Sequence, residues 1–349
     1  MLYKLLNDKE VIGFIYSSST ELGFCDYCYS ENVPIIDPRE LQELFEPIVS
    51  LFKPVLLLGI TVKEEKLLYQ KIQDAWHIFK ATDDRVIDNL LKNILSDNVP
   101  PTDLLLSSPV EIEALFNPSL VIDFHEKKWQ NFAKEIKYKN RFFLNETIDL
   151  KLLADLLISF SKSYPRGKIF YRARISDKSG YDIGNMGKPP AEKATSGRAN
   201  PNGIAYLYLS TKIETVIYET RSSYLDFISI GEFKLMDTLH VISLRQITTL
   251  SPFMFADQLQ NYMIHQKYLS RLEEELSKPV RRFDKELDYL PSQYLCEYVK
   301  YLGYDAIEYG SSLYEGGINL AVFNDYKLEV KSVELYEISS VNLNFKKLS

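Results

Sequence analysis

The sequence predicts an α+β protein in which a mainly α-helical N-terminal region, residues 1–160, precedes a β-rich region with inserted helices, residues 161–349. In the first region, apolar residues recur three and four positions apart, which is typical of amphipathic helices. After Gly167 the pattern changes to short runs rich in aromatic and β-branched residues, separated by glycine and proline, which indicates strands. Hydrophobic residues make up 46% and charged residues 26% of the 349 residues, so the chain can bury a core.

Three helices are predicted in the N-terminal region. Asp37 followed by Pro38 marks a helix start, because aspartate caps free N–H groups and proline lacks the N–H that would be unpaired at the first helical position. A second helical pattern runs from residue 64 to about residue 94, with a polar break near residues 82–84, and a third covers residues 148–160.

The β-rich region combines six expected strands with three helices. Thr211 and Glu214 match a capping box, which predicts a helix over 212–220 directly after a strand. Two further helices are expected over 257–276 and 291–302. The strands are expected at 168–175, 203–210, 227–235, 239–244, 318–323 and 327–338.

Composition excludes several classes of protein. The net charge of −7 has the wrong sign for a general nucleic-acid binder. The longest uncharged apolar run, Pro54 to Val62, is far shorter than the roughly 20 residues of a membrane span. Charges within the first ten residues argue against a secretory signal, and three cysteines do not form a disulfide framework. We therefore expect a cytoplasmic protein that binds neither membrane nor nucleic acid.

Residues suited to a phosphate-bearing ligand cluster in the second region. The segments YRAR (171–174) and GRANPNG (197–203) place arginines beside glycines, so that a guanidinium can bond an anion in bidentate fashion while the backbone approaches closely. Glu219 lies late in the predicted helix 212–220. Near the C-terminus, Ser311 and Ser312 precede a glycine pair and Asn319.

The order of these segments resembles the RES domain, the toxin half of RES-Xre toxin–antitoxin pairs. The resemblance rests on YRAR, a proline pair at 189–190, GRANPNGIAYLYLST, ETVIYE and SQYLCEYVKYLGYDAIEYGSSLYEGGINLAVF, and it covers residues 169–324. The preceding half, with its CDYC and WQNFAKEIKYKNRFF segments, is similar to the HEPN-type N-terminal region of longer family members.

The resemblance implies a fold similar to ADP-ribosyltransferases and a toxin that cleaves the nicotinamide–ribose bond of NAD+, by hydrolysis or phosphorolysis. NAD+ would be the substrate, and no cofactor or metal is implied. By position, Arg198, Tyr208 and Glu219 match family residues, and Ser311 or Ser312 matches the serine, with Ser311 favoured by spacing. Arg172 matches an earlier arginine. The remaining expected binding residues are Tyr171, Asn200 and Asn319.

The chemistry of the reaction gives each of these residues a role that does not depend on the resemblance. Nicotinamide leaves NAD+ as a neutral molecule, so the transition state needs stabilisation of positive charge on the ribose, which the carboxylate of Glu219 would supply. Arg198 and Arg172 would hold the pyrophosphate. Tyr208 would stack on the ligand or bond the ribose, and Ser311 would fix the ribose.

Other interpretations stay open at this point. The same cleft would serve ADP-ribosyl transfer to a macromolecule, and a catalytically silent RES fold would serve binding alone. Arg172 is equally consistent with a structural strand residue, Tyr208 with a core residue, and the serine pair 311–312 with a turn. An NAD+-consuming toxin must be restrained, so we expect an Xre-like antitoxin or inhibition by the N-terminal region; a homo-oligomer is also compatible with the sequence.

Two further motifs bear on function. Cys25 and Cys28 form half of a zinc site, and since the chain offers no second pair we expect a metal-free remnant.

HEPN-type ribonucleases place an arginine shortly before a histidine. None of the four histidines, at 77, 125, 240 and 265, has an arginine within the seven preceding positions, which argues against ribonuclease activity.

Overall fold

A computed structural model describes residues 5–80, 83–99, 103–116, 124–279 and 285–342. The chain forms two compact units that do not follow a single cut in the sequence. The first comprises residues 1–123 together with 248–267, and the second comprises residues 124–247 together with 268–349. The second unit thus includes residues 124–160, which the sequence groups with the N-terminal region. The two units are described separately.

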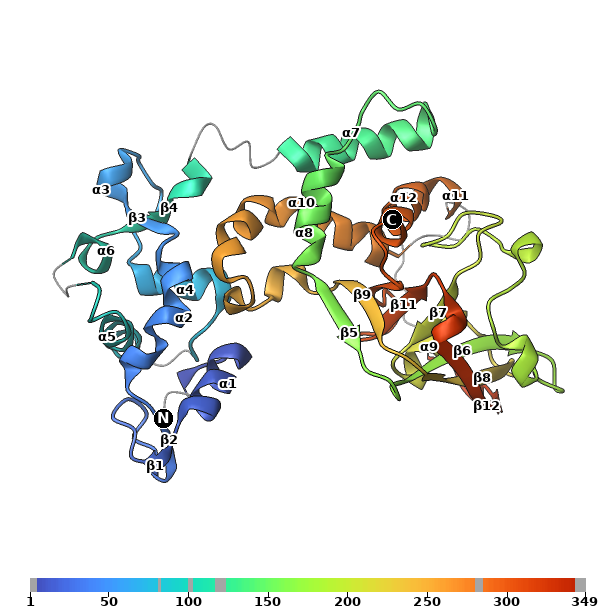
Figure 1. Ribbon diagram of the computed structural model, residues 1–349, viewed down its shortest axis with the longest axis horizontal. Helices are drawn as coiled ribbons and strands as arrows, with labels where there is room; N and C mark the ends of the chain where they lie inside the picture. Colours follow the sequence, from blue (N-terminus) through green and yellow to red (C-terminus); the bar gives the residue numbers. More distant parts are fainter. Residues whose placement is uncertain (1–4, 81–82, 100–102, 117–123, 280–284, 343–349) are drawn as a thin grey trace. The chain divides into compact units, whose positions relative to one another are not determined.

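The first unit is mainly helical, as predicted (Figure 1). Asp37 caps the predicted helix start through a capping box with Glu40, and a short 3₁₀ helix leads into α2. Phe45 on α2 is fully buried and packs against Phe79, with ring centroids 6.5 Å apart, and against Phe253 at 5.0 Å. The elements are α1 (Lys9–Ser18), β1 (Glu21–Gly23), β2 (Val33–Ile35), α2 (Gln42–Val49), β3 (Phe52–Pro54), α3 (Val55–Leu58), α4 (Leu68–Trp76), α5 (Asp84–Ile94), α6 (Leu104–Ser107) and β4 (Val110–Ile112).

The helical pattern predicted over 64–94 is divided between α4 and α5. The division arises because His77 adopts the left-handed conformation, with φ of 50°, and ends α4. Phe79 then pairs with Leu6 in an isolated bridge and is fully buried. A new cap at Asp83, whose side chain accepts from the N–H of Arg85, begins α5.

The second unit is built on an eight-stranded mixed sheet in the order β12-β8-β6-β7-β11-β10-β9-β5 (Figure 1). Neighbouring strands are antiparallel except β9 and β10, which pair in parallel. All six predicted strands are present, and β5 and β10 are additional. The strands are β5 (Ser161–Tyr164), β6 (Ile169–Ser176), β7 (Leu207–Ser210), β8 (Phe227–Leu235), β9 (Leu239–Leu244), β10 (Ala306–Gly310), β11 (Ile318–Val322) and β12 (Leu328–Glu337).

Helices cover this sheet and position its loops. The helix predicted over 212–220 is α9 (Ile213–Thr220), which packs on β6 and β7. The predicted capping box is wrong: the N-cap is Lys212, and no side chain caps the helix. The remaining helices are α7 (Phe124–Tyr138), α8 (Leu150–Ile158), α10 (Leu259–Ser277), α11 (Lys285–Asp288) and α12 (Leu290–Tyr301), of which α10 begins in the first unit and continues into the second. None of the helices in the described ranges combines the length and apolar character of a membrane span.

Candidate active site

A cleft of about 480 Å³ opens in the second unit where α9 meets β6, β7, β10 and β11. This volume lies within the range of small-molecule sites, roughly 300–1,000 Å³. The cleft brings together six of the residues singled out in the sequence, namely Arg172, Arg198, Tyr208, Glu219, Ser312 and Asn319. The other lining residues are Ala173, Gly197, Leu209, Val216, Thr220, Arg221, Tyr289 and Tyr309.

Glu219 presents its carboxylate from the last turn of α9. Its Oε1 accepts two hydrogen bonds, from Ser311 Oγ at 2.7 Å and from Asn319 Nδ2 at 2.7 Å. α9 ends one residue later because Arg221 adopts the left-handed conformation, with φ of 52°. The helix end and the two hydrogen bonds therefore fix this carboxylate in the cleft wall.

Ser311 and Ser312 have different positions. Ser311 follows the last residue of β10, and its Oγ accepts from the backbone N–H groups of Leu313 (3.2 Å) and Tyr314 (3.1 Å) while donating to Glu219. Both lone pairs of the Ser311 hydroxyl oxygen accept backbone N–H groups, and its proton is donated to Glu219. The hydroxyl therefore orients the carboxylate and is not available to a ligand. Ser312 is the member of the pair that lines the cleft.

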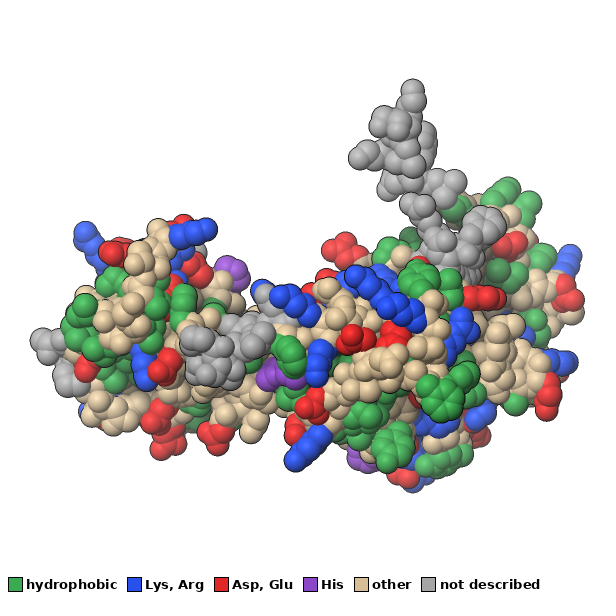
Figure 2. Space-filling model, turned by 90° about the horizontal axis from the view of Figure 1, so that it is seen from above, with side chains coloured by type: hydrophobic (Ala, Val, Ile, Leu, Met, Phe, Trp, Pro, Cys, Tyr) green, Lys and Arg blue, Asp and Glu red, His purple; other side chains and the backbone are tan. Residues whose placement is uncertain are grey.

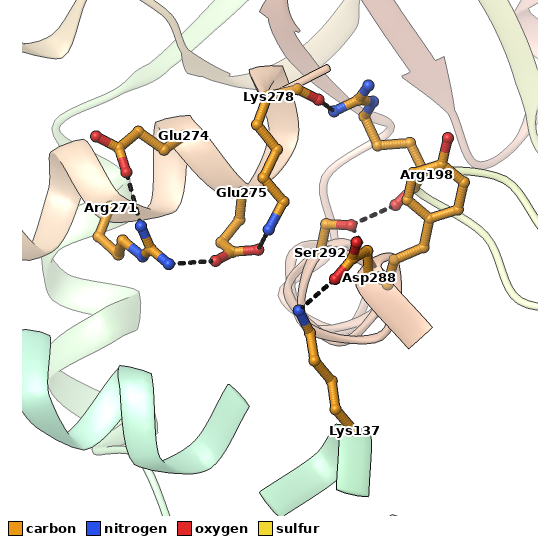
Figure 3. A network of polar contacts seen from close by, with 9 residues as sticks. Lys137, Arg198, Arg271, Glu274, Glu275, Lys278, Asp288 and Ser292 are labelled. Carbon is orange, nitrogen blue, oxygen red and sulfur yellow. Dashed lines mark hydrogen bonds and ion pairs between the residues drawn. The ribbon is translucent and has the colours of Figure 1, made fainter. Parts of the chain in front are cut away.

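Arg198 is anchored at both ends of the residue, as Figure 3 shows. Its Nη1 donates to the carbonyl of Lys278 at 2.6 Å, and its own carbonyl accepts from Ser292 Oγ at 2.6 Å. The guanidinium lies 5.7 Å from the centroid of the Tyr289 ring. A guanidinium has five N–H donors, and within the described part of the chain the bond to Lys278 uses one of them, so most are available to an anionic ligand in the cleft.

The loop that carries Arg198 is held by Tyr208 and Asn200. The Tyr208 hydroxyl donates to Asn200 Oδ1 at 2.6 Å and accepts from the N–H of Ala199 at 3.0 Å. Gly197 must be glycine, because a Cβ there would lie 2.5 Å from the Tyr208 hydroxyl. The Tyr208 hydroxyl thus serves the loop, burial raises its pKa, and its ring remains as a ligand surface.

Asn200 and Tyr171, both expected to bind the ligand, do not line the cleft. Asn200 is 3% exposed, and its Nδ2 donates to backbone carbonyls of its own loop, at 2.7 Å in the case of Ile204. It shapes the loop from behind. Tyr171 lies beside Arg172 on β6 but is not among the residues that line the cleft.

Arg172 lines the cleft and also anchors a neighbouring loop. Its Nη1 donates to the carbonyls of Met186 at 3.0 Å and Gly187 at 2.5 Å. Burial, with a smaller contribution from Arg174, lowers the pKa of Arg172 to about 10, so the group is still a cation at neutral pH. The binding and structural interpretations of this residue are therefore compatible.

Two residues of α12 were missed in the sequence. Gln293 Nε2 donates to the carbonyls of Gly197 at 2.8 Å and Asn200 at 3.0 Å, and Ser292 bonds the carbonyl of Arg198. Both are buried. The available signal was a pair of polar residues at the start of an otherwise apolar helical pattern, because buried polar groups require partners. Tyr289 and Tyr309 in the cleft were also missed.

The second unit is thus an α+β domain whose cleft combines one fixed carboxylate with three arginines, Arg172, Arg198 and Arg221. Residues 169–341 match the family model described as the RES domain. The match extends beyond the expected residue 324. The relation of the N-terminal half to HEPN-type regions stays a prediction.

Comparison with solved structures finds a similarity to a chain of the crystal structure of the M. tuberculosis MbcT–MbcA toxin–antitoxin complex. The sequences are 12% identical, the similarity covers 54% of this chain and 94% of that chain, and the TM-score is 0.35. No curated protein matches the chain.

Proposed function

We propose that the RES domain is an NAD+-consuming, toxin-like enzyme that cleaves the bond between nicotinamide and ribose. The observation that carries the proposal is the Glu219 carboxylate, fixed by Ser311 and Asn319 in a cleft that also holds Arg198 and Arg172. This arrangement pairs an anion for the reacting sugar with cations for a pyrophosphate. The match of residues 169–341 to the RES domain model supports it.

Glu219 would act on the ribose. Departure of neutral nicotinamide leaves positive charge on the sugar, and a carboxylate that is already oriented stabilises this charge without reorganising. Its Oε1 is occupied by Ser311 and Asn319, and no hydrogen bond to Oε2 is present among the described residues. Oε2 is therefore the oxygen assigned to the ribose. Ser311 and Asn319 are positioning residues in this scheme.

The two arginines would bind the pyrophosphate. Among the described residues, the Arg198 guanidinium bonds the carbonyl of Lys278, and its other donors remain for the ligand. The bond from Ser292 to the backbone carbonyl of Arg198 reduces the conformational entropy lost on binding. The faces of Tyr208 and Tyr289 offer stacking surfaces for the aromatic ends of the dinucleotide. The attacking group would be water or phosphate, and a cytoplasmic antitoxin or the N-terminal region would restrain the reaction.

The test is incubation of the purified full chain with NAD+, with and without inorganic phosphate, followed by chromatography and mass spectrometry. Release of nicotinamide with free ADP-ribose identifies hydrolysis, whereas ADP-ribose phosphate identifies phosphorolysis. ADP-ribose attached to a macromolecule would instead favour the transferase alternative. NAD+ is also measured in cells that express the chain, because inhibition by the N-terminal region could suppress the activity of the purified protein. Unchanged NAD+ in both experiments refutes the proposal.

A further inference from the structure

The connection between α7 and α8 exposes two consecutive phenylalanines. Phe142 and Phe143 are each 90% exposed, the highest values among large hydrophobic side chains of the described residues. Tyr138, at the end of α7, is 68% exposed. Exposed apolar side chains that occur singly need no explanation, but a contiguous aromatic patch marks an interaction site.

The loop holds these rings outward by specific bonds. Glu135, in the last turn of α7, is 3% exposed, and its Oε2 accepts from the N–H of Glu146 at 2.6 Å. Its Oε1 accepts from the N–H of Asn145 at 3.0 Å and from the side chain of Asn140 at 3.2 Å. One buried carboxylate thus ties both ends of the loop, and the phenylalanines between them are presented on a defined backbone.

α7 itself is firmly attached to the second unit. Phe132 is fully buried and meets the ring of Tyr294 on α12, with centroids 4.7 Å apart. Lys137 forms an ion pair with Asp288 at 2.8 Å (Figure 3). The aromatic loop therefore extends from a fixed helix.

α7 and the first half of the loop are basic in an acidic protein, whereas the second half of the loop carries Glu146 and Asp149, both exposed. Residues 127–143 contain six lysines and arginines and one carboxylate, the buried Glu135, whereas the whole chain has a net charge of −7. Four of the cations are exposed: Lys127, Lys134, Lys139 and Arg141. Figure 2, seen from above, shows Lys and Arg side chains interspersed with hydrophobic and acidic ones.

We propose that the α7–α8 loop, residues 139–149, docks the protein on an anionic lipid surface. Phe142 and Phe143 enter the headgroup region, and the cations around them, Arg141 among these, contact lipid phosphates. Aromatic rings favour this interface, and each lysine or arginine near an anionic membrane adds attraction. Binding of this kind is peripheral and needs no membrane-spanning segment. The proposal therefore departs from the expectation of no membrane partner, which rested on the absence of a long apolar run.

A single-stranded nucleic acid is the competing ligand for basic and aromatic residues. Such strands are bound along a charged groove in which successive bases stack on ring faces. Here the two rings are consecutive and almost wholly exposed at the turn of one loop. This geometry favours insertion of the two rings into the headgroup region of a lipid bilayer over stacking of bases along a groove.

The test is co-sedimentation of the full chain with vesicles of phosphatidylcholine alone and of an equal mixture of phosphatidylcholine and phosphatidylglycerol. We expect binding to the mixed vesicles and weak binding to the neutral ones. The double variant Phe142→Ala/Phe143→Ala and the double variant Lys139→Glu/Arg141→Glu should each weaken binding by about tenfold or more. Circular dichroism checks that both variants fold.

A matched control is Leu56→Ala/Leu57→Ala, which removes two adjacent side chains that are 77% and 67% exposed on α3. This variant should bind the mixed vesicles like the unmodified chain. Failure of the unmodified chain to bind mixed vesicles, equal binding by the Phe142/Phe143 variant, or displacement from vesicles by single-stranded RNA would each overturn the proposal. NAD+ turnover in solution should be unchanged in the loop variants, so the outcome is independent of the proposed enzymatic function.

Discussion

Glu219→Gln separates the charge of the carboxylate from its shape. Glutamine keeps an oxygen that can accept from Ser311 and Asn319, the two donors now 2.7 Å from Oε1. The hydrogen-bonded framework therefore survives, and the variant lacks the negative charge alone. We expect its thermal unfolding midpoint and its KM for NAD+ to stay close to those of the unmodified protein.

The loss of turnover follows from electrostatics. A carboxylate about 4 Å from a unit positive charge stabilises it by roughly 4 kcal/mol at an effective dielectric constant of about 20. The ribose carries only part of a charge in the transition state, and the cleft is open to water, so part of this energy is realised. We expect kcat to fall on the order of 10²- to 10³-fold, the range seen when a fixed electrostatic group is removed.

The assay is nicotinamide release over a range of NAD+ concentrations, so that kcat and KM are obtained separately. Glu214→Gln, on the first turn of the same helix and outside the cleft lining, is the matched control and should leave both unchanged. A Glu219→Gln protein that retains near-normal kcat would show that the carboxylate does not stabilise the transition state, and the scheme would fail.

Three more outcomes are expected. Arg198→Lys keeps the charge but loses the planar fork, so KM for NAD+ should rise more than kcat falls in steady-state kinetics, and a pure kcat effect would contradict pyrophosphate binding. Tyr208→Phe leaves Asn200 Oδ1 and an N–H unpaired, so urea unfolding should show a loss of about 1–3 kcal/mol; unchanged stability would argue against the loop role. Backbone N–H groups of Asn145 and Glu146 lower the pKa of Glu135 from 4.5 to about 2. Its contribution to stability is therefore complete above pH 4.5 and is lost as pH falls toward 2, and Glu135→Gln should remove this part of the acid dependence of thermal unfolding.

The elements that the sequence predicted are those with an unbroken period. Alternation in 168–175 and the apolar spacing in 291–302 matched β6 and α12 closely. β10 was missed because Glu308 interrupts its apolar run, and carboxylates are rare in strands. In the folded protein Glu308 is fully buried and accepts from Lys162 at 2.6 Å, from Ser243 at 2.8 Å and from Tyr164. These partners come from other strands, so the residues next to Glu308 in the sequence do not predict them.

In the candidate site, too, the local sequence predicts some residues but not the remote residues that hold them. Arg198, Glu219 and Asn319 were predicted and lie in one cleft, but their supports are remote in sequence. The carbonyl that holds the Arg198 guanidinium belongs to Lys278, 80 positions away, and Ser292 is 94 positions away. Residue type and local spacing predict which groups meet a ligand, whereas the groups that orient them follow from the tertiary fold.

The order in which the chain is synthesised has a consequence for the cleft. The first unit needs residues 248–267, which emerge from the ribosome after strands β5 to β9 of the second. Ser311 and Asn319, which orient Glu219, emerge later still, 92 and 100 positions after Glu219 itself. The growing polypeptide therefore cannot assemble the site before β11 has been made, and a cell that makes this protein meets a complete cleft only on chains that already contain both units' segments up to Asn319.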